Sequence, residues 1–273
     1  MSTKVVLEAG KSDQEYFRDL WRFRGLFYVL ARRDISVRYK QTAVGVLWAV
    51  LRPALTTLVF TLVFGGLAKF PSDGVPYPVL VLSGMLPWQL FSAALNESGQ
   101  SLLSNSALIT KVYFPRLIIP GSSLVTSLVD FCISLGMLAI VMAVFGVAPG
   151  WQLLLLPIFV ALALACAAGM GVWIAALNVK YRDFALVVPF MSQLGLYVSP
   201  VGFTSAIVPE HWRVLYQLNP LVGVIDGFRW CVLGGRTSFN WTGLGLSLAI
   251  IGVLAVTGFR YFRRTERSFA DVI

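Results

Sequence analysis

Three ionisable residues lie inside long apolar segments of the sequence, namely Arg52, Glu97 and Asp130. Charged groups are costly within a bilayer, so they usually face protein or water and have partners. Arg52 lies about 13 Å into its segment at 1.5 Å per residue, and Glu97 lies near the inner end of the next, so the two could pair. A packing salt bridge is the favoured interpretation, and a contact with an anionic lipid headgroup is the alternative. Asp130 lies deeper, and we expect it to be either protonated or hydrogen-bonded to hydroxyls of its own segment.

Aromatic residues make up 13% of the chain and could contact a substrate. Aromatic faces bind sugar rings through apolar contact while tolerating varied hydroxyl patterns. Several fall where interfacial aromatic belts are expected, such as Trp151, Trp241 and Tyr261. Others are placed to line a pathway across the membrane: Tyr39, Trp48, Trp88, Phe91 and Tyr197. The first four of these are the candidates for contact with a glycan in a channel.

No pattern typical of an enzyme occurs in the sequence. HExxH and GxSxG are absent, and the GKS at Gly10–Ser12 has Val5 where a phosphate loop needs its first glycine. The cysteines lack a metal-like spacing, and the single histidine, His211, has no visible ligand partners. The sequence therefore predicts no catalytic, cofactor or metal site, and we expect that this chain does not itself bind ATP.

The composition indicates a polytopic membrane protein. Of the 273 residues, 57% are hydrophobic and 13% are charged, whereas soluble domains average about 25% charged residues. Six segments hold the roughly 20 apolar residues that a transmembrane helix needs: 44–67, 79–100, 117–146, 152–177, 185–205 and 241–260. We expect an all-α membrane protein with a cytoplasmic segment at 1–42, a transmembrane domain at 43–260 and a cytoplasmic tail at 261–273.

The segment 206–240 decides the topology. It is apolar enough to suggest a seventh span, but it holds Pro220, Asp226 and Arg229. With six spans and a cytoplasmic N-terminus, 17 of the 22 Lys and Arg residues lie in inner segments, and a seventh span would move the basic segment 260–267 outside. We therefore predict a re-entrant or interfacial hairpin on the outer face. Its candidate gate residues, which allow tight turns and close approach, are Pro220, Gly223 and Gly227.

The N-terminal segment has a helical apolar pattern. Tyr16, Leu20, Phe23, Phe27 and Leu30 recur at spacings of four and three residues, which places them on one face. Most of the neighbouring arginines lie off that face. The pattern predicts a basic amphipathic helix in the cytoplasmic interface of the membrane, and a helix packed on a partner protein is the alternative.

The turn LITKVYFPR, residues 108–116, combines two cations with apolar side chains. The preference for positive charge on the inner side explains Lys111 and Arg116. It does not explain four apolar residues on an exposed turn: Leu108, Ile109, Val112 and Phe114. Exposed apolar groups of this kind indicate a partner surface.

Several stretches together resemble the permease subunit of ABC-2-type polysaccharide exporters, over about residues 15–267. They are RDISVRYKQTAVGVLWAVLRP (33–53), LITKVYFPRLIIPGSSLVTSLVDF (108–131), NVKYRDF (178–184) and LNPLVGVIDGFRW (218–230). The resemblance implies a homodimer in the bacterial inner membrane, with both termini cytoplasmic. It also implies two copies of a separate ATPase subunit that bind ATP and Mg²⁺, and outward export of a lipid-linked polysaccharide such as O-antigen.

The same resemblance implies a coupling helix at about 102–116, an interface helix at the N-terminus and re-entrant gate helices at about 206–240. The residues that would contact the ATPase are Leu108, Ile109, Lys111, Val112, Phe114 and Arg116. Two alternatives remain. One is an ABC-2 exporter of small amphiphiles or lipo-oligosaccharides. The other is a membrane-embedded glycan-synthesis enzyme, for which Asp183 alone would not supply an acidic site.

Overall fold

The computed structural model describes residues 13–40, 45–72, 74–181 and 183–269, and these ranges are helical with no strand. The elements in chain order are α1 (Asp13–Arg22), α2 (Arg24–Lys40), α3 (Gly45–Phe60), η1 (Thr61–Leu67), α4 (Tyr77–Ser104), α5 (Ser106–Lys111), α6 (Ile118–Val144), η2 (Trp151–Leu155), α7 (Leu156–Lys180), α8 (Phe184–Val198), η3 (Ser205–Ile207), α9 (Glu210–Gln217), α10 (Pro220–Val232), α11 (Trp241–Thr265) and η4 (Glu266–Ser268).

Five helical stretches are long and apolar enough to cross a membrane: Leu47–Leu67, Tyr77–Ser104, Ile118–Val144, Trp151–Lys180 and Trp241–Thr265. Each coincides with one of the predicted spans. The first continues from α3 into a single π-helical segment, η1, and the fourth begins as a short 3₁₀ helix, η2. The prediction of an all-α membrane protein is confirmed at this level, because segment length and apolarity are local properties of a sequence.

The fifth predicted span, 185–205, is shorter than expected. Helix α8 has 15 residues and ends at Val198, which gives a length of about 22 Å against a hydrocarbon thickness of about 30 Å. The helix stops because Ser199 precedes Pro200, and a residue before proline is driven out of the helical conformation. Ser199 accordingly adopts an extended backbone, with φ −88° and ψ 155°.

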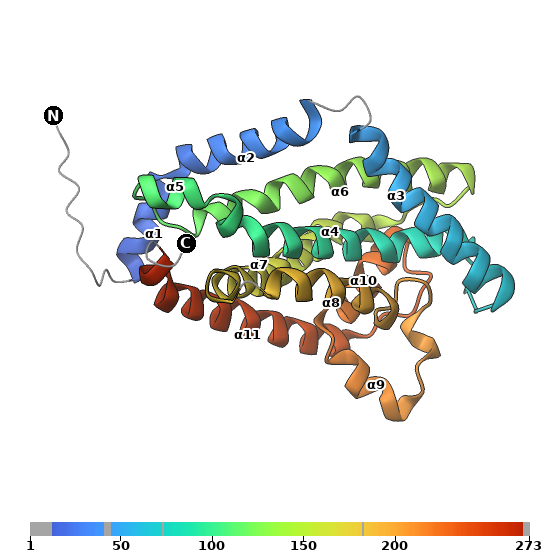
Figure 1. Cartoon of the computed structure of the whole chain (residues 1–273). Helices are drawn as coiled ribbons and strands as arrows, with labels where there is room; N and C mark the ends of the chain where they lie inside the picture. Colours follow the sequence, from blue (N-terminus) through green and yellow to red (C-terminus); the bar gives the residue numbers. More distant parts are fainter. Residues whose placement is uncertain (1–12, 41–44, 73, 182, 270–273) are drawn as a thin grey trace.

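Helices α4, α6, α7 and α11 form a bundle, with α4 against both α6 and α7 (Figure 1). Helices α1 and α5 and the C-terminal end of α11 gather at one end, which we call the proximal end. Helix α9 and the α3–α4 connection lie at the opposite, distal end. Helix α2 lies along the side of α6, and α3 continues from there towards the distal end.

The core consists of two groups of buried side chains. The larger surrounds α4 and includes Leu80, Leu82, Met85 and Phe228, all with no exposed surface. The smaller lies at the proximal end and is called the proximal core. Its members include Leu30, Leu102, Ile109, Phe114, Phe262 and Phe269. The proximal core therefore joins residues from both ends of the sequence.

The segment 206–240 does not form a seventh spanning helix in the structure. Helix α9 is exposed at the distal end, whereas α10 packs against α4, α7 and α11. Nine consecutive residues of α10, from Leu221 to Arg229, are buried. Pro220 begins this helix, and the side chain of Asn219 caps it by accepting a hydrogen bond from the Leu221 N–H at 3.1 Å.

The amphipathic N-terminal pattern is divided between two helices, since a turn at Phe23 separates α1 from α2. Tyr16 and Leu30 are buried, Leu20 and Phe23 are half-buried, and Phe27 is exposed. The chain itself therefore covers part of the apolar face that was predicted to meet the membrane interface.

Candidate functional site

A cavity of about 570 Å³, here called the central cavity, lies between α2, α3, α4, α6 and α8. Two of the aromatic residues predicted to contact a glycan line it: Trp48, which is 50% exposed, and Trp88, which is buried. Phe91 is buried behind Trp88, with 5.6 Å between the ring centroids, and is not part of the wall. Tyr39 and Tyr197 do not line the cavity either.

The remaining wall of the central cavity combines apolar and polar residues. It includes side chains that can donate and accept hydrogen bonds, among them Arg52, Gln89, Asn96, Ser127 and Asp130. Arg52 is exposed, and within the described part of the chain it forms no ion pair. Flat apolar faces beside amides and a free guanidinium provide both kinds of contact that a hydrated, ring-shaped ligand requires.

A charged cluster lies along the α2 side of this cavity. The guanidinium of Arg38 bonds Glu97 of α4 and, at 2.7 Å, Asp130 of α6. The Tyr39 hydroxyl donates to Asp130, and the Ser127 hydroxyl donates to Glu97 at 2.8 Å. These contacts join α2, α4 and α6 through side chains that are only partly exposed.

The predicted pairing of Arg52 with Glu97 is wrong, because Arg38 takes that place. The prediction for Asp130 is also corrected, since its carboxylate is bonded by Arg38 and Tyr39 of α2 rather than by hydroxyls of α6. Both errors have one cause. The sequence pattern placed α2 at the membrane surface, whereas the structure packs it along α6, where its basic end reaches the carboxylates.

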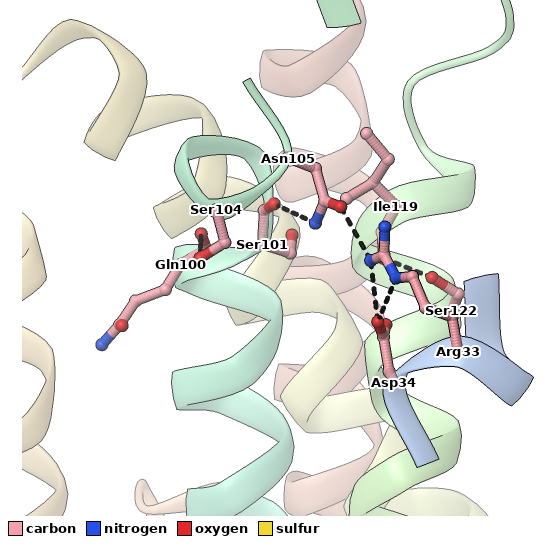
Figure 2. Close-up of polar contacts among 8 residues, drawn as sticks. All are labelled: Arg33, Asp34, Gln100, Ser101, Ser104, Asn105, Ile119 and Ser122. Atoms are coloured by element: carbon pink, nitrogen blue, oxygen red, sulfur yellow. Dashed lines mark hydrogen bonds and ion pairs between the residues drawn. The ribbon is translucent and has the colours of Figure 1, made fainter. Parts of the chain in front are cut away.

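A second link joins α2 to the corner between α4 and α5. Figure 2 shows Arg33 of α2 beside Asn105, whose side-chain oxygen accepts a hydrogen bond from the guanidinium at 2.8 Å. The Asn105 amide donates in turn to the Ser101 carbonyl at 2.9 Å, and Arg33 also pairs with Asp34 at 2.7 Å. The corner that precedes α5 is therefore held to α2 by a specific side chain.

The predicted partner surface at 108–116 differs from the expectation. Val112 is 51% exposed, but Leu108 is half-buried, and Ile109 and Phe114 are only 4% and 3% exposed. The expectation that all four are exposed is wrong for Ile109 and Phe114, because the proximal core covers them. The side chains that do face outward here are Thr110, Lys111, Val112 and Tyr113. The helix expected at about 102–116 is divided in the structure, since α4 runs to Ser104 and α5 spans only Ser106–Lys111.

Glu266 ties the end of this turn to both ends of the chain. Its carboxylate accepts from the Arg116 backbone N–H at 2.9 Å and from the Tyr16 hydroxyl at 3.1 Å. The Arg116 guanidinium donates to the Glu266 carbonyl, and the Arg263 guanidinium lies 3.8 Å from the centre of the Tyr16 ring. Burial and the Glu266 carboxylate raise the pKa of Tyr16, so its hydroxyl remains a donor at neutral pH. Sequence reasoning missed Glu266, which has no local pattern around it.

The predicted gate residues lie where α10 packs most tightly. A Cβ atom at Gly227 would overlap the ring of Phe159 in α7, and one at Gly223 would meet Ser247 and the backbone of α11. These glycines therefore permit close helix packing. Nothing in their positions tests a gating role.

The sequence analysis also missed the part played by Arg229, which is 1% exposed in α10. Its guanidinium donates to the carbonyls of Pro200 at 2.7 Å, Val201 at 3.2 Å and Phe203 at 3.1 Å. Asp226 lies 3.7 Å from it and accepts a hydrogen bond from Ser205. Burial raises the pKa of Asp226 to about 6, against the opposing effects of Arg229 and Ser205. The signal was the DGFR sequence, which places two opposite charges three residues apart in an apolar helix.

In residues 13–40, 45–72, 74–181 and 183–269, no group of three or more His, Cys, Asp or Glu side chains is arranged to hold a metal ion. The candidate site consists of the central cavity, the charged cluster and the proximal contacts with α5.

Comparison with known proteins agrees with this geometry. The O-antigen export system permease protein RfbA of Myxococcus xanthus is 31% identical over 215 residues, which are 78% of this chain and 82% of that protein. An RfbA of Klebsiella pneumoniae is 25% identical over 91% of this chain and 95% of its own length. The polysialic acid transport protein KpsM of Escherichia coli is 23% identical over 76% of this chain and 80% of its own length. The family model for the ABC-2 type transporter matches residues 25–233, from α2 to the end of α10, so the chain belongs to the ABC-2 type transporter family.

Proposed function

We propose that this chain is the permease subunit of an ATP-driven exporter that moves a lipid-linked polysaccharide outward across a bacterial inner membrane. The observation that carries the proposal is the wall of the central cavity, which holds the rings of Trp48 and Trp88 together with side-chain amides and the Arg52 guanidinium. An exporter of small amphiphiles would favour a more uniformly apolar cavity. The similar proteins are O-antigen and polysialic acid transport proteins, which supports a glycan over a small amphiphile as the substrate.

The cavity is expected to be one half of a channel. Helices α3 and α8 meet beside it, with 6.3 Å between the ring centroids of Phe60 and Tyr197. Both helices present large exposed apolar side chains on this side: Leu55, Leu58, Val59, Phe190, Met191 and Leu194. A second copy of the chain that packs against these side chains would enclose the cavity, held by van der Waals packing between the helices. A homodimer is therefore part of the proposal.

We place the proximal end in the cytoplasm and the distal end outside, with both termini cytoplasmic. Most of the Lys and Arg residues lie in the segments that the proximal end gathers, as positive-inside bias requires. Arg18, Arg22 and Arg24 are exposed on α1 and the start of α2, where they could meet lipid headgroups. Helices α9 and α10 then form a hairpin on the outer side, with α10 re-entering the protein without crossing it.

A separate ATPase subunit, which would bind ATP and Mg²⁺, is proposed to dock at α5 and the turn after it. The exposed Lys111, Val112 and Tyr113 supply one charge, one apolar group and one aromatic ring for that contact. Movement of this corner would reach α2 through the Arg33–Asn105 hydrogen bond and would reach α1 and α11 through Glu266. Rigid links of this kind transmit displacement better than a flexible loop does.

The experiment that tests this proposal measures the amount of polysaccharide at the surface of cells whose permease carries Trp48→Ala. Loss of one stacking ring should lower export about fivefold, with expression and association with the ATPase unchanged. Trp212→Ala is the matched control, since Trp212 is 54% exposed on α9 and lies outside the central cavity. Normal export by Trp48→Ala would contradict the proposed pathway.

A second measurement separates the two exporter classes. Stimulation of the complex's ATPase activity by small amphiphiles but not by the glycan would favour the alternative exporter.

A further inference from the structure

A second cavity, of about 580 Å³ and here called the distal cavity, lies between η3, α9, α10 and the start of α11. None of the residues in its wall lines the central cavity. It is at the end of the molecule that the proposed function places outside the membrane. The pathway described above does not use it, so its lining calls for a separate explanation.

Asp226 of α10 is one of the polar groups that line the distal cavity. This residue is 9% exposed, accepts a hydrogen bond from Ser205 and lies 3.7 Å from Arg229. A carboxylate has about four acceptor positions on its two oxygens. These two partners leave acceptor capacity that faces the cavity.

The hydroxyl of Tyr216 is the second polar group of this wall. It is buried, and within the described residues it has no hydrogen-bond partner. Burial and the nearby Asp226 carboxylate raise the pKa of Tyr216, so the hydroxyl remains protonated and can donate. A buried hydroxyl without a partner destabilises a fold, which makes it a group that a ligand can satisfy.

Aromatic side chains supply a flat surface at the mouth of the distal cavity. Trp241 is 67% exposed, and Phe239 supports it edge-on with 4.7 Å between centroids and 83° between planes. Beside it, Asn240 uses its side-chain oxygen to cap α11, accepting from Thr242 and Gly243 at 3.1 Å each. The side-chain NH₂ group of Asn240 takes no part in this cap and can donate.

We propose that the distal cavity binds a sugar unit of the exported polysaccharide as the polysaccharide leaves the central cavity. This inference rests on the proposed function. A sugar ring needs an apolar face, an acceptor and a donor, which Trp241, Asp226 and Tyr216 provide. The carboxylate of Asp226 would repel the phosphate of a phospholipid headgroup, whereas Arg213 in the same wall would attract it, so the test below includes anionic lipid. A metal ion fits less well, since Asp226 is a single carboxylate already paired with Arg229.

The test measures binding to the full chain, assembled with its ATPase in nanodiscs. The probe is the producing strain's own surface polysaccharide, cleaved from its lipid. Tyr216→Phe removes only the unpartnered hydroxyl, and should raise the Kd about fivefold without lowering the Tm. Trp241→Ala should raise the Kd about tenfold. Trp151→Ala is the matched control, because Trp151 is 68% exposed, lies edge-on to Trp230 as Trp241 does, and is outside the cavity.

The outcomes separate the inference from the function on which it rests. Wild-type affinity in both Tyr216→Phe and Trp241→Ala would overturn the distal site while leaving the proposed function intact. Equal loss in Trp151→Ala would also overturn it, since the effect would then belong to the whole aromatic belt. If the two variants differed from the wild type only in their response to the phosphatidylglycerol content of the nanodiscs, with polysaccharide affinity unchanged, the cavity would be identified as a lipid site. No binding and no export by the wild-type complex would instead refute the proposed function.

Discussion

Arg38 joins two carboxylates that would otherwise lie unpaired in the middle of the bundle. Its guanidinium bonds Glu97 and Asp130, and Tyr39 and Ser127 each occupy one further carboxylate oxygen. The side chains of Arg38, Glu97 and Asp130 remain 39%, 26% and 21% exposed, respectively. The contribution of this cluster to the free energy of unfolding therefore lies between two cases. An exposed ion pair contributes little, and in a fully buried pair the cost of desolvation offsets most of the attraction. Its main consequence is geometric, because it sets the position of α2 on α4 and α6.

At the residue scale we predict that Arg38→Gln lowers the Tm of the purified protein and that Arg52→Gln, its control in the same cavity, does not. Removing the guanidinium leaves two carboxylates facing each other without a cation. A double-mutant cycle with Glu97→Gln should give a coupling of about 1–2 kcal/mol in the free energy of unfolding. Additive effects of the two substitutions would show that the pair contributes nothing beyond its parts.

At the element scale, α5 and the turn after it have a buried side that packs in the proximal core and an exposed side that is proposed to contact the ATPase. Phe114 packs in the proximal core, so Phe114→Ala should cost about 3 kcal/mol of stability and reduce the yield of folded protein. Tyr113 is 55% exposed. Tyr113→Ala should leave thermal unfolding unchanged and lower co-purification of the ATPase about fivefold or more.

The two measurements for this prediction are the Tm of the permease and the amount of ATPase recovered in a pull-down. Thr110→Ala serves as a control on the same short helix, since Thr110 is exposed and its hydroxyl bonds only carbonyls of its own turn. If Phe114→Ala were to fold normally and lose the ATPase, while Tyr113→Ala kept it, the assignment of the two sides would be reversed.

Also at the element scale, α10 has no room for a side chain where it crosses α7. Gly227→Leu should separate the two helices, because the new side chain would occupy the position of the Phe159 ring. We expect reduced export and a lower Tm, with partial recovery in the double variant Gly227→Leu with Phe159→Ala. Gly245→Ala on α11 is the control, since a Cβ atom there meets no neighbour within 4 Å.

Export lost without any change in the Tm would indicate that α10 moves during transport. Normal export by well-expressed Gly227→Leu would show that close packing of α10 on α7 is not needed for function. In both cases export and Tm are compared with those of Gly245→Ala in the same membranes.

At the scale of the whole molecule, the proposed orientation predicts which positions a membrane-impermeant thiol reagent reaches from outside. Cysteines introduced at His211, Lys111 and Arg267, all exposed, should be labelled from outside only at His211. The native Cys132 is exposed in the structure and must first be replaced by serine. External labelling at position 267 would exclude an even number of crossings between a cytoplasmic N-terminus and that residue.

The whole molecule also shows how the two ends of the sequence stabilise one site. Glu266 and Phe269 from the C-terminal region meet Tyr16 from α1 and Arg116 from the turn after α5. Anything that moves α5 therefore acts on the first and last helices together.

The amino-acid sequence by itself determined the parts of this protein that depend on neighbouring residues. Apolar length predicted the five long helices, and several separate motifs indicated the family. Other features needed the tertiary structure, because they join residues far apart in the chain. Arg38 displaced Arg52 as the partner of Glu97 once α2 packed along α6. Phe114 turned inward because Phe262 and Phe269, from the other end of the chain, form the core around it. Hydropathy and helical spacing describe which side chains avoid water, but only the packing of distant helices decides which surface covers them.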